Sequence, residues 1–174
     1  MKISEVTVLE NQNIQSIKPE TIIDNESGWG SVPNNQDVDY FGLRVEMTPN
    51  TFLSLAAPLG SNIPSDEIVK HIQNGGKIGS PFLNISIPKE WLEDNPDNNL
   101  FLDLTAAVFA HEGRNRMLAV KEILGNIPVE THLFFDGYVK NRHLTPEIIK
   151  AMQNKLRSES GDNIVEGNLF GVLG

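Results

Sequence analysis

An apolar run that passes directly into a charged turn constrains the fold of this chain more than any other feature. The run, residues 104–110, is short enough for a central strand. The turn, residues 111–116, reads His-Glu-Gly-Arg-Asn-Arg. Apolar side chains then recur at helical spacing as far as Gly125, and residues 127–135 alternate as in a strand. This segment therefore predicts strand, turn, helix and strand.

Periodicity predicts further elements on both sides of that segment. The expected elements are a strand at 41–47, helices at 51–59 and 65–73, a strand at 82–87, an exposed loop at 88–99 pinned by Trp91, and a helix that begins at Thr145. A length of 174 residues suits one domain, so we expect a single α+β domain with a small mixed sheet flanked by helices.

Polar segments suggest where that domain begins and ends. Residues 1–39 are expected to form an arm or edge strands packed on the core, with Trp29 as a packing anchor. Residues 40–160 make up the domain, and residues 161–174 form a tail that is loosely ordered or pairs at a sheet edge.

Composition narrows the function classes. The chain has no cysteine, which excludes disulfides, thiolate metal sites and cysteine nucleophiles. The start of the chain lacks an apolar signal core and no run is long enough to span a membrane, so a cytoplasmic protein is expected. A net charge of −9 disfavours direct binding to duplex DNA, because such binding depends on Lys and Arg.

The charged turn is the best candidate for a functional site. A helix start offers free N–H groups and a favourable dipole to an anion. Arg114 and Arg116 add forked donors, Gly113 allows close approach to a ligand, and Glu112 is the candidate catalytic base or metal ligand. His111 and Asn115 complete the expected ligand-binding set. The alternative is a solvated helix end, on which Glu112 pairs with the arginines.

Three segments also carry a family resemblance: the expected helix and strand between Asp66 and Ile87, the sequence His-Glu-Gly-Arg-Asn-Arg-Met-Leu-Ala at 111–119, and Gly-Asn-Ile-Pro-Val at 125–129. Together they resemble the ParB/sulfiredoxin-like superfamily, whose signature is a Gly-Glu-Arg-Arg-like turn that opens a helix. The resemblance covers about residues 40–135 and is to small, phage-type members. It implies a ParB/sulfiredoxin-like core that binds nucleotide phosphates at this turn.

By position, Glu112 matches the motif glutamate, and Arg114 and Arg116 match its arginines. The glycine follows the glutamate here instead of preceding it, which changes the contacts expected with phosphate. Without cysteine, sulfiredoxin chemistry is excluded. Without a recognisable helix-turn-helix or a basic surface, a DNA partition clamp is also disfavoured.

Secondary candidates lie outside the turn. Ser80 precedes a predicted strand and is expected to approach the ligand, although a turn-forming serine is the simpler interpretation. Arg142 and His143 precede the last helix and would close over the same site, unless they form an ordinary surface loop. His71 and His132 lack metal-ligand spacing, so no metal site is predicted from the protein's own ligands.

These features lead to one preferred function and two alternatives. The preferred function is binding of a nucleotide or phosphorylated ligand at residues 111–116, with magnesium as a companion ion and with nucleotide hydrolysis or phosphoryl transfer as the chemistry to test. The first alternative is a non-catalytic, phage-type protein whose acidic surface binds a host protein or a protein that handles nucleic acid. The second is a nuclease, which the net charge disfavours.

Overall fold

The computed structural model describes residues 1–9, 41–56, 62–76, 78–93, 100–135, 145–164 and 166–171. In these ranges, six strands form one mixed sheet: β1 (Thr7–Val8), β2 (Phe41–Met47), β3 (Phe82–Ile85), β4 (Val108–Glu112), β5 (Val129–Phe135) and β6 (Leu169–Gly171). The α-helices are α1 (Pro49–Leu55), α2 (Asp66–Gln73), α3 (Lys89–Leu92), α4 (Leu104–Ala107), α5 (Arg114–Leu124) and α6 (Pro146–Ser160). Short 3-10 turns lie at Ile3–Glu5, Gly161–Asn163 and Glu166–Asn168. The predicted single α+β domain with a mixed sheet is confirmed.

The strand order is β1-β2-β5-β3-β4, and β6 also pairs with β2. The pair β3 and β5 is parallel, and the other pairs are antiparallel. Both ends of the chain join the outer edge of β2, where β6 pairs with residues 41–43 and β1 with residues 45–46. Within the expected tail, residues 169–171 pair at a sheet edge, and residues 172–174 lie outside the described residues.

One face of the sheet carries the main core. Leu43 of β2 lies opposite Leu133 of β5, and both are fully buried. The amphipathic stripe of α6, namely Ile149, Met152 and Leu156, belongs to the same cluster. Helix α6 begins as its sequence predicts, because the Thr145 hydroxyl accepts a hydrogen bond from the Ile148 amide and Pro146 occupies the first turn.

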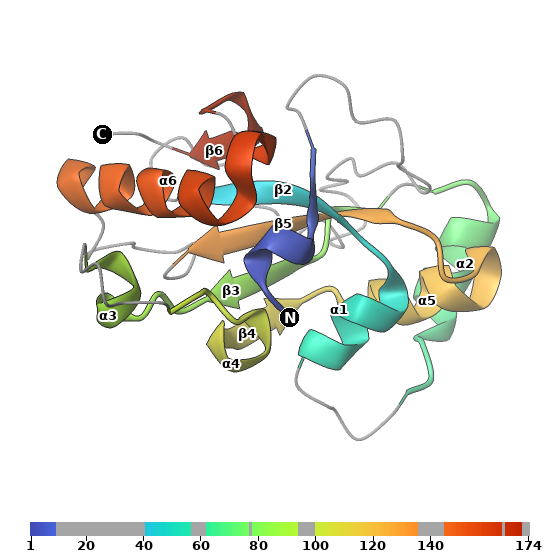
Figure 1. Cartoon of the computed structure of the whole chain (residues 1–174). Coiled ribbons are helices and arrows are strands. Elements are labelled where there is room, and N and C mark those ends of the chain that lie inside the picture. The colour runs from blue at the N-terminus through green and yellow to red at the C-terminus, as the bar shows by residue number, and fades with distance from the viewer. Residues whose placement is uncertain are drawn as a thin grey trace.

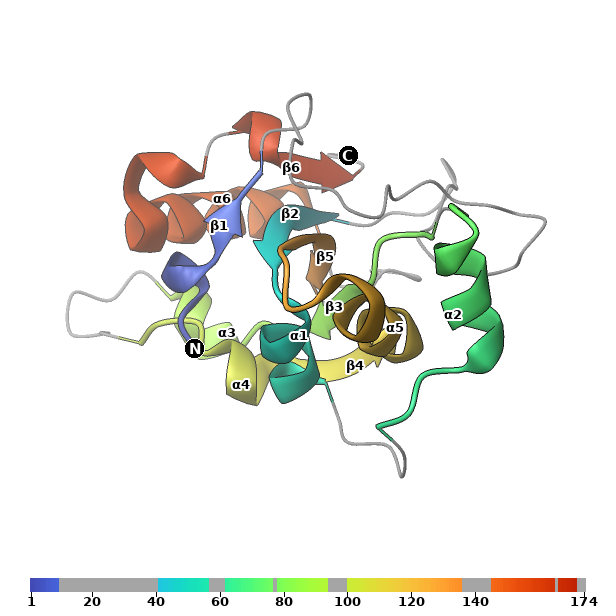
Figure 2. The ribbon, with the colours of Figure 1, turned by 90° about the vertical axis from the view of Figure 1, so that its right-hand side faces the viewer.

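Helices α1, α2 and α5 gather at one end of the sheet, and α6 extends toward the other end (Figure 1). The view from that first end places α5 in front, with α6 and α2 on opposite sides of the strands (Figure 2). This end of the sheet is where β2 and β4 finish and where β5 begins. It therefore holds the turn that opens α5.

The interpretation of residues 104–110 as a central strand is wrong. Residues Leu104–Ala107 form the helical turn α4, and the strand β4 that follows lies at the edge of the sheet. Asp103 caps the turn, because its carboxylate accepts a hydrogen bond from the Thr105 amide over 3.1 Å. A short apolar run suits a helix and a strand alike, and here Phe109 remains 58% exposed on the edge.

Smaller differences affect other boundaries. Helix α1 begins at Pro49, two residues before the predicted start, because Thr48 caps it through the Thr51 amide. The predicted loop at 88–99 contains helix α3, and Trp91 is buried there as an anchor, as expected. Residues 57–61 and 94–99 lie outside the described residues, as does Trp29.

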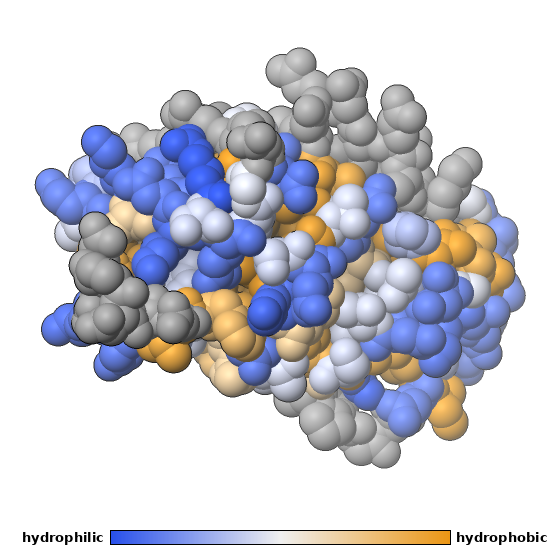
Figure 3. All heavy atoms as spheres, viewed as in Figure 1, coloured by the Kyte–Doolittle hydropathy of each residue, from blue (hydrophilic) through white to orange (hydrophobic). Residues whose placement is uncertain are grey.

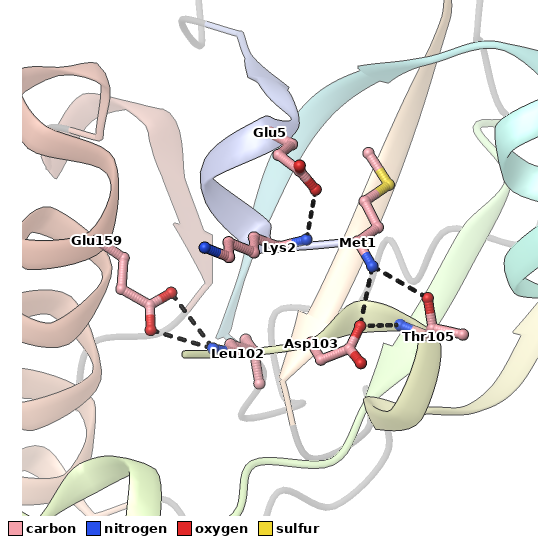
Figure 4. Close-up of polar contacts among 7 residues, drawn as sticks. All are labelled: Met1, Lys2, Glu5, Leu102, Asp103, Thr105 and Glu159. Carbon is pink, nitrogen blue, oxygen red and sulfur yellow. Dashed lines mark hydrogen bonds and ion pairs between the residues drawn. The ribbon is translucent and has the colours of Figure 1, made fainter. Parts of the chain in front are cut away.

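The first residues of the chain are tied to the segment before α4 (Figure 4). The Met1 nitrogen donates to the Asp103 carboxylate at 2.9 Å, and the Ile3 amide donates to the Leu102 carbonyl at 3.1 Å. Glu159 of α6 holds the same segment by accepting the Leu102 amide at 3.0 Å. These contacts join α6, α4 and the N-terminal residues. Among the described residues, none of the helices has the length and apolar character needed to cross a bilayer.

Candidate functional site

The turn into α5 depends on Gly113. This glycine has φ of 103°, a conformation that strongly disfavours residues with a side chain. A Cβ atom there would lie 2.7 Å from Cβ of Pro81 and 3.0 Å from Nη2 of Arg116. Gly113 is thus fixed by backbone conformation and by close packing. The turn is shorter than predicted, because His111 and Glu112 belong to β4.

The Arg116 side chain is buried and is held by contacts within the protein. Its side chain is 4% exposed, and Nη1 donates to the Gly79 carbonyl at 2.7 Å. Its Nη2 lies 3.8 Å from the Glu112 carboxylate. Burial lowers the pKa of the Arg116 guanidinium to about 10, although the neighbouring Glu112 charge opposes that shift. Arg116 stays charged at neutral pH and ties α5 to the segment before β3.

Glu112 and His111 point to opposite faces of β4. The Glu112 side chain is 58% exposed beside Arg116, while His111 is half-buried and packs edge-on against Phe52 of α1, with ring centroids 6.5 Å apart. The alternative interpretation, in which Glu112 pairs with the arginines of the turn, therefore holds for Arg116. It does not hold for Arg114, which bonds to Asn62 in the segment before α2.

Arg114 is the unusual side chain of the turn. It is 8% exposed, and its Nη2 donates to Oδ1 of Asn62 at 2.7 Å. Its Nε and Nη1 atoms are buried and have no hydrogen-bond partner among the described residues. A buried guanidinium with one neutral acceptor is costly, because charge removed from water needs an opposite charge or several hydrogen bonds.

A pocket of about 690 Å³ borders Arg114 between α1 and α5. In the space-filling view, the surface is hollowed at the lower right, where the ribbon has these two helices (Figure 3). Its described lining residues come from α1, from the segment before α2 and from one side of α5: Asn50, Leu53, Ser54, Asn62, Pro64, Arg114, Leu118, Lys121 and Glu122. This volume is typical of a pocket for a small molecule.

The structure separates the predicted site residues. Of the expected residues that the structure describes, Arg114 alone lines this pocket, and Asn115 is exposed on the first turn of α5. Ser80 is buried, and its hydroxyl donates to Glu130 at 3.3 Å, away from the pocket lining. Arg142 and His143 lie outside the described residues.

A second group of polar residues is buried on the sheet face opposite the main core. Oε1 of Glu130 lies 3.5 Å from Nε2 of His132 and 3.6 Å from Nε of Arg44. Glu130 and His132 are 4% and 5% exposed. Burial lowers the pKa of His132, although the hydrogen bond and charge of Glu130 act in the opposite direction. These residues form a polar group on the paired strands β2 and β5.

Sequence reasoning missed the other side of the pocket. Asn50 and Asn62 come from segments more than fifty residues before Arg114, and no local pattern links them to it. A signal did exist for Lys121, because positions 114, 118 and 121 fall on one face of a helix.

The described residues supply little for a metal ion. They contain no group of three or more His, Cys, Asp or Glu side chains placed to hold one.

Comparison of the chain with protein-family models, with curated proteins and with solved structures found no match.

Proposed function

We propose that the pocket between α1 and α5 binds the phosphate group of a nucleotide or another phosphorylated small molecule, with Arg114 as the main contact. One observation carries the proposal: a buried guanidinium beside a pocket of about 690 Å³ has two nitrogens without partners among the described residues. A phosphate supplies both the charge and the acceptors that these nitrogens lack.

The surroundings of Arg114 favour an anion over a neutral ligand. Arg114 is the first residue of α5, where unsatisfied backbone amides and the helix dipole add positive potential. Lys121 lies on the same pocket wall, and Glu122 is the one acidic residue of the described lining. The formal charge of that lining is +1, although the whole chain carries −9. The resemblance to nucleotide-binding ParB/sulfiredoxin-like turns points to the same ligand class.

Binding is better supported than catalysis. Glu112, the expected catalytic residue, lies beside Arg116 and is not among the residues that line the pocket. Hydrolysis or phosphoryl transfer through Glu112 would require the phosphate to reach the outer face of β4. The proposed activity is therefore ligand binding, and any nucleotide turnover is expected to survive Glu112→Gln.

A thermal-shift screen tests the proposal. The panel contains inorganic phosphate, pyrophosphate and the common nucleotides, each with and without magnesium. A ligand at about 100 times its dissociation constant adds roughly 2.7 kcal/mol to the free energy of unfolding. We expect such a shift in the unmodified protein and none in Arg114→Met. Arg157→Met, at an exposed position on α6, is the matched control and keeps the shift.

A flat response across the panel, in folded protein, overturns the proposal. It would favour the interaction-protein alternative, in which the acidic surface binds another protein. A shift that survives in Arg114→Met also overturns it, because the ligand would then bind elsewhere.

A further inference from the structure

We infer that the pocket is specific for a guanosine phosphate, with the phosphate on Arg114 and guanine between Asn50, Lys121 and Glu122 at the opposite end. This inference rests on the proposed function and adds a base-recognition site to it. Three observations carry it: the antiparallel arrangement of α1 and α5, the spacing of their polar side chains, and the donors and acceptors at the far end.

The two helices run antiparallel along the pocket. Asn50 lies at the start of α1, and its backbone N–H donates to Oδ1 of Asn126 at 2.9 Å. Asn126 lies two residues beyond the end of α5. At the other end, Asn62 bonds to Arg114, the first residue of α5. The lining residues therefore divide into an Arg114 end, with Asn62 and Pro64, and a Lys121 end, with Asn50 and Glu122.

The distance between the two ends suits a nucleotide. Arg114 and Lys121 are seven residues apart on one helix, which places their backbones about 10 Å apart along the axis. Leu53 and Leu118 line the pocket as well, and Leu118 lies between the two cations along α5. Apolar side chains at that position can pack against a sugar or the flat face of a base.

The Lys121 end carries both donors and acceptors. The Glu122 carboxylate only accepts hydrogen bonds, and the Lys121 ammonium only donates them. The side-chain amide of Asn50 can do both. Guanine presents two adjacent N–H groups, at N1 and N2, which match the two oxygens of one carboxylate. Its O6 and N7 acceptors match an ammonium and an amide. Adenine has no N–H at N1, so it leaves one carboxylate oxygen unpaired.

Titration calorimetry with four ligands tests the inference: GMP, IMP, AMP and ribose 5-phosphate. IMP lacks the N2 amino group of guanine, and ribose 5-phosphate lacks the base. We expect affinity to fall in that order, with GMP at least about tenfold tighter than AMP, as one charged hydrogen bond implies. Glu122→Gln is expected to reduce the preference for GMP over AMP, because one guanine N–H loses its charged acceptor. Lys121→Met is expected to weaken the binding of GMP and IMP, whose O6 loses its donor. Glu147→Gln and Lys150→Met, exposed on α6, are the controls and leave all four affinities unchanged.

The outcomes separate this inference from the proposed function. If all four ligands bind equally and only through Arg114, the phosphate site stands and the guanine site is wrong. If AMP binds more tightly than GMP, or if Glu122→Gln leaves the preference for GMP intact, the inference is overturned. If none binds to folded protein, both fail.

Discussion

Arg114 and Asn62 are joined by a hydrogen bond of 2.7 Å, which is the one partner found for this buried guanidinium among the described residues. Two residues further along α5, Arg116 donates to the Gly79 carbonyl and lies beside Glu112. The two arginines of the turn therefore differ in energetic role. Arg116 is satisfied by the fold, and Arg114 is left with capacity for a ligand.

Replacing each arginine by methionine should separate these roles. Arg114→Met removes an unsatisfied buried charge, so the free energy of unfolding without ligand should stay the same or rise by about 1 kcal/mol. Arg116→Met leaves the Gly79 carbonyl without its donor and should lower that free energy by about 2 kcal/mol. Urea denaturation measures both. Loss of stability in Arg114→Met, equal to that in Arg116→Met, would show that Arg114 is structural.

Gly113 should not tolerate a side chain. In Gly113→Ala, the new Cβ meets Pro81 at 2.7 Å and the residue keeps an unfavourable φ of 103°, so we expect a loss of about 3 kcal/mol or more. Gly75→Ala is the control for conformation alone, since its φ is 77° and nothing lies within 4 Å of the new Cβ. It should cost about 1 kcal/mol. Equal thermal denaturation midpoints for the two variants would refute the packing argument.

Much of the fold could be predicted from local periodicity. The alternation at 41–47 fits only a strand, and the apolar spacing in α6 fits only a helix. Both elements were found where expected. The segment before the charged turn could not be predicted in this way. A run of seven residues, apolar except for Thr105, suits one helical turn or a strand, and Asp103 decided the outcome by capping α4.

The candidate site was only partly predictable. A turn rich in arginine drew attention to residues 111–116, but the sequence did not reveal that Arg114 and Arg116 face different environments. That difference depends on Asn62 and Gly79, which reach the turn through tertiary packing. Similarly, the burial of Glu130 and His132 follows from the position of β5 between β2 and β3, a topology that no local pattern specifies.

Glu159 should matter for the packing of α6. One of its oxygens accepts from Nε1 of Trp91 at 2.5 Å and from the Leu102 amide at 3.0 Å. Glu159→Ala should lower the free energy of unfolding by about 2 kcal/mol, because both donors are left unpaired. Glu159→Gln keeps one acceptor oxygen and should lose less. Trp91 emission should change with the alanine variant, and an unchanged spectrum and midpoint would contradict the role given to this contact.

His132 should make stability fall in mild acid. Burial lowers its pKa in the folded protein, so the unfolded chain binds more protons below its ordinary value of about 6.5. The part of the free energy of unfolding that depends on neutral His132 is therefore fully present above about pH 6.5. It is lost as the pH falls through the lower pKa of the folded state. The charges of Arg44 and Glu130 act on the His132 ring in opposite directions: Arg44 lowers its pKa and Glu130 raises it.

The His132 effect can be isolated by comparing the unmodified protein with His132→Phe at a series of pH values. Between pH 6.5 and 5, the free energy of unfolding should fall more steeply with acid in the unmodified protein than in the variant. Parallel curves over this range would mean that His132 does not titrate as its burial implies.

The most direct test of the phosphate site is to observe the Arg114 Nε–H group itself by ¹⁵N–¹H NMR, with Arg114→Met used to assign the signal. Titration with pyrophosphate or a nucleotide should shift this resonance in a saturable way, while the Arg116 Nε–H signal moves little. If a ligand binds and shifts other resonances while that of Arg114 stays in place, or if no signal moves at all, then the unpaired guanidinium is not an anion site.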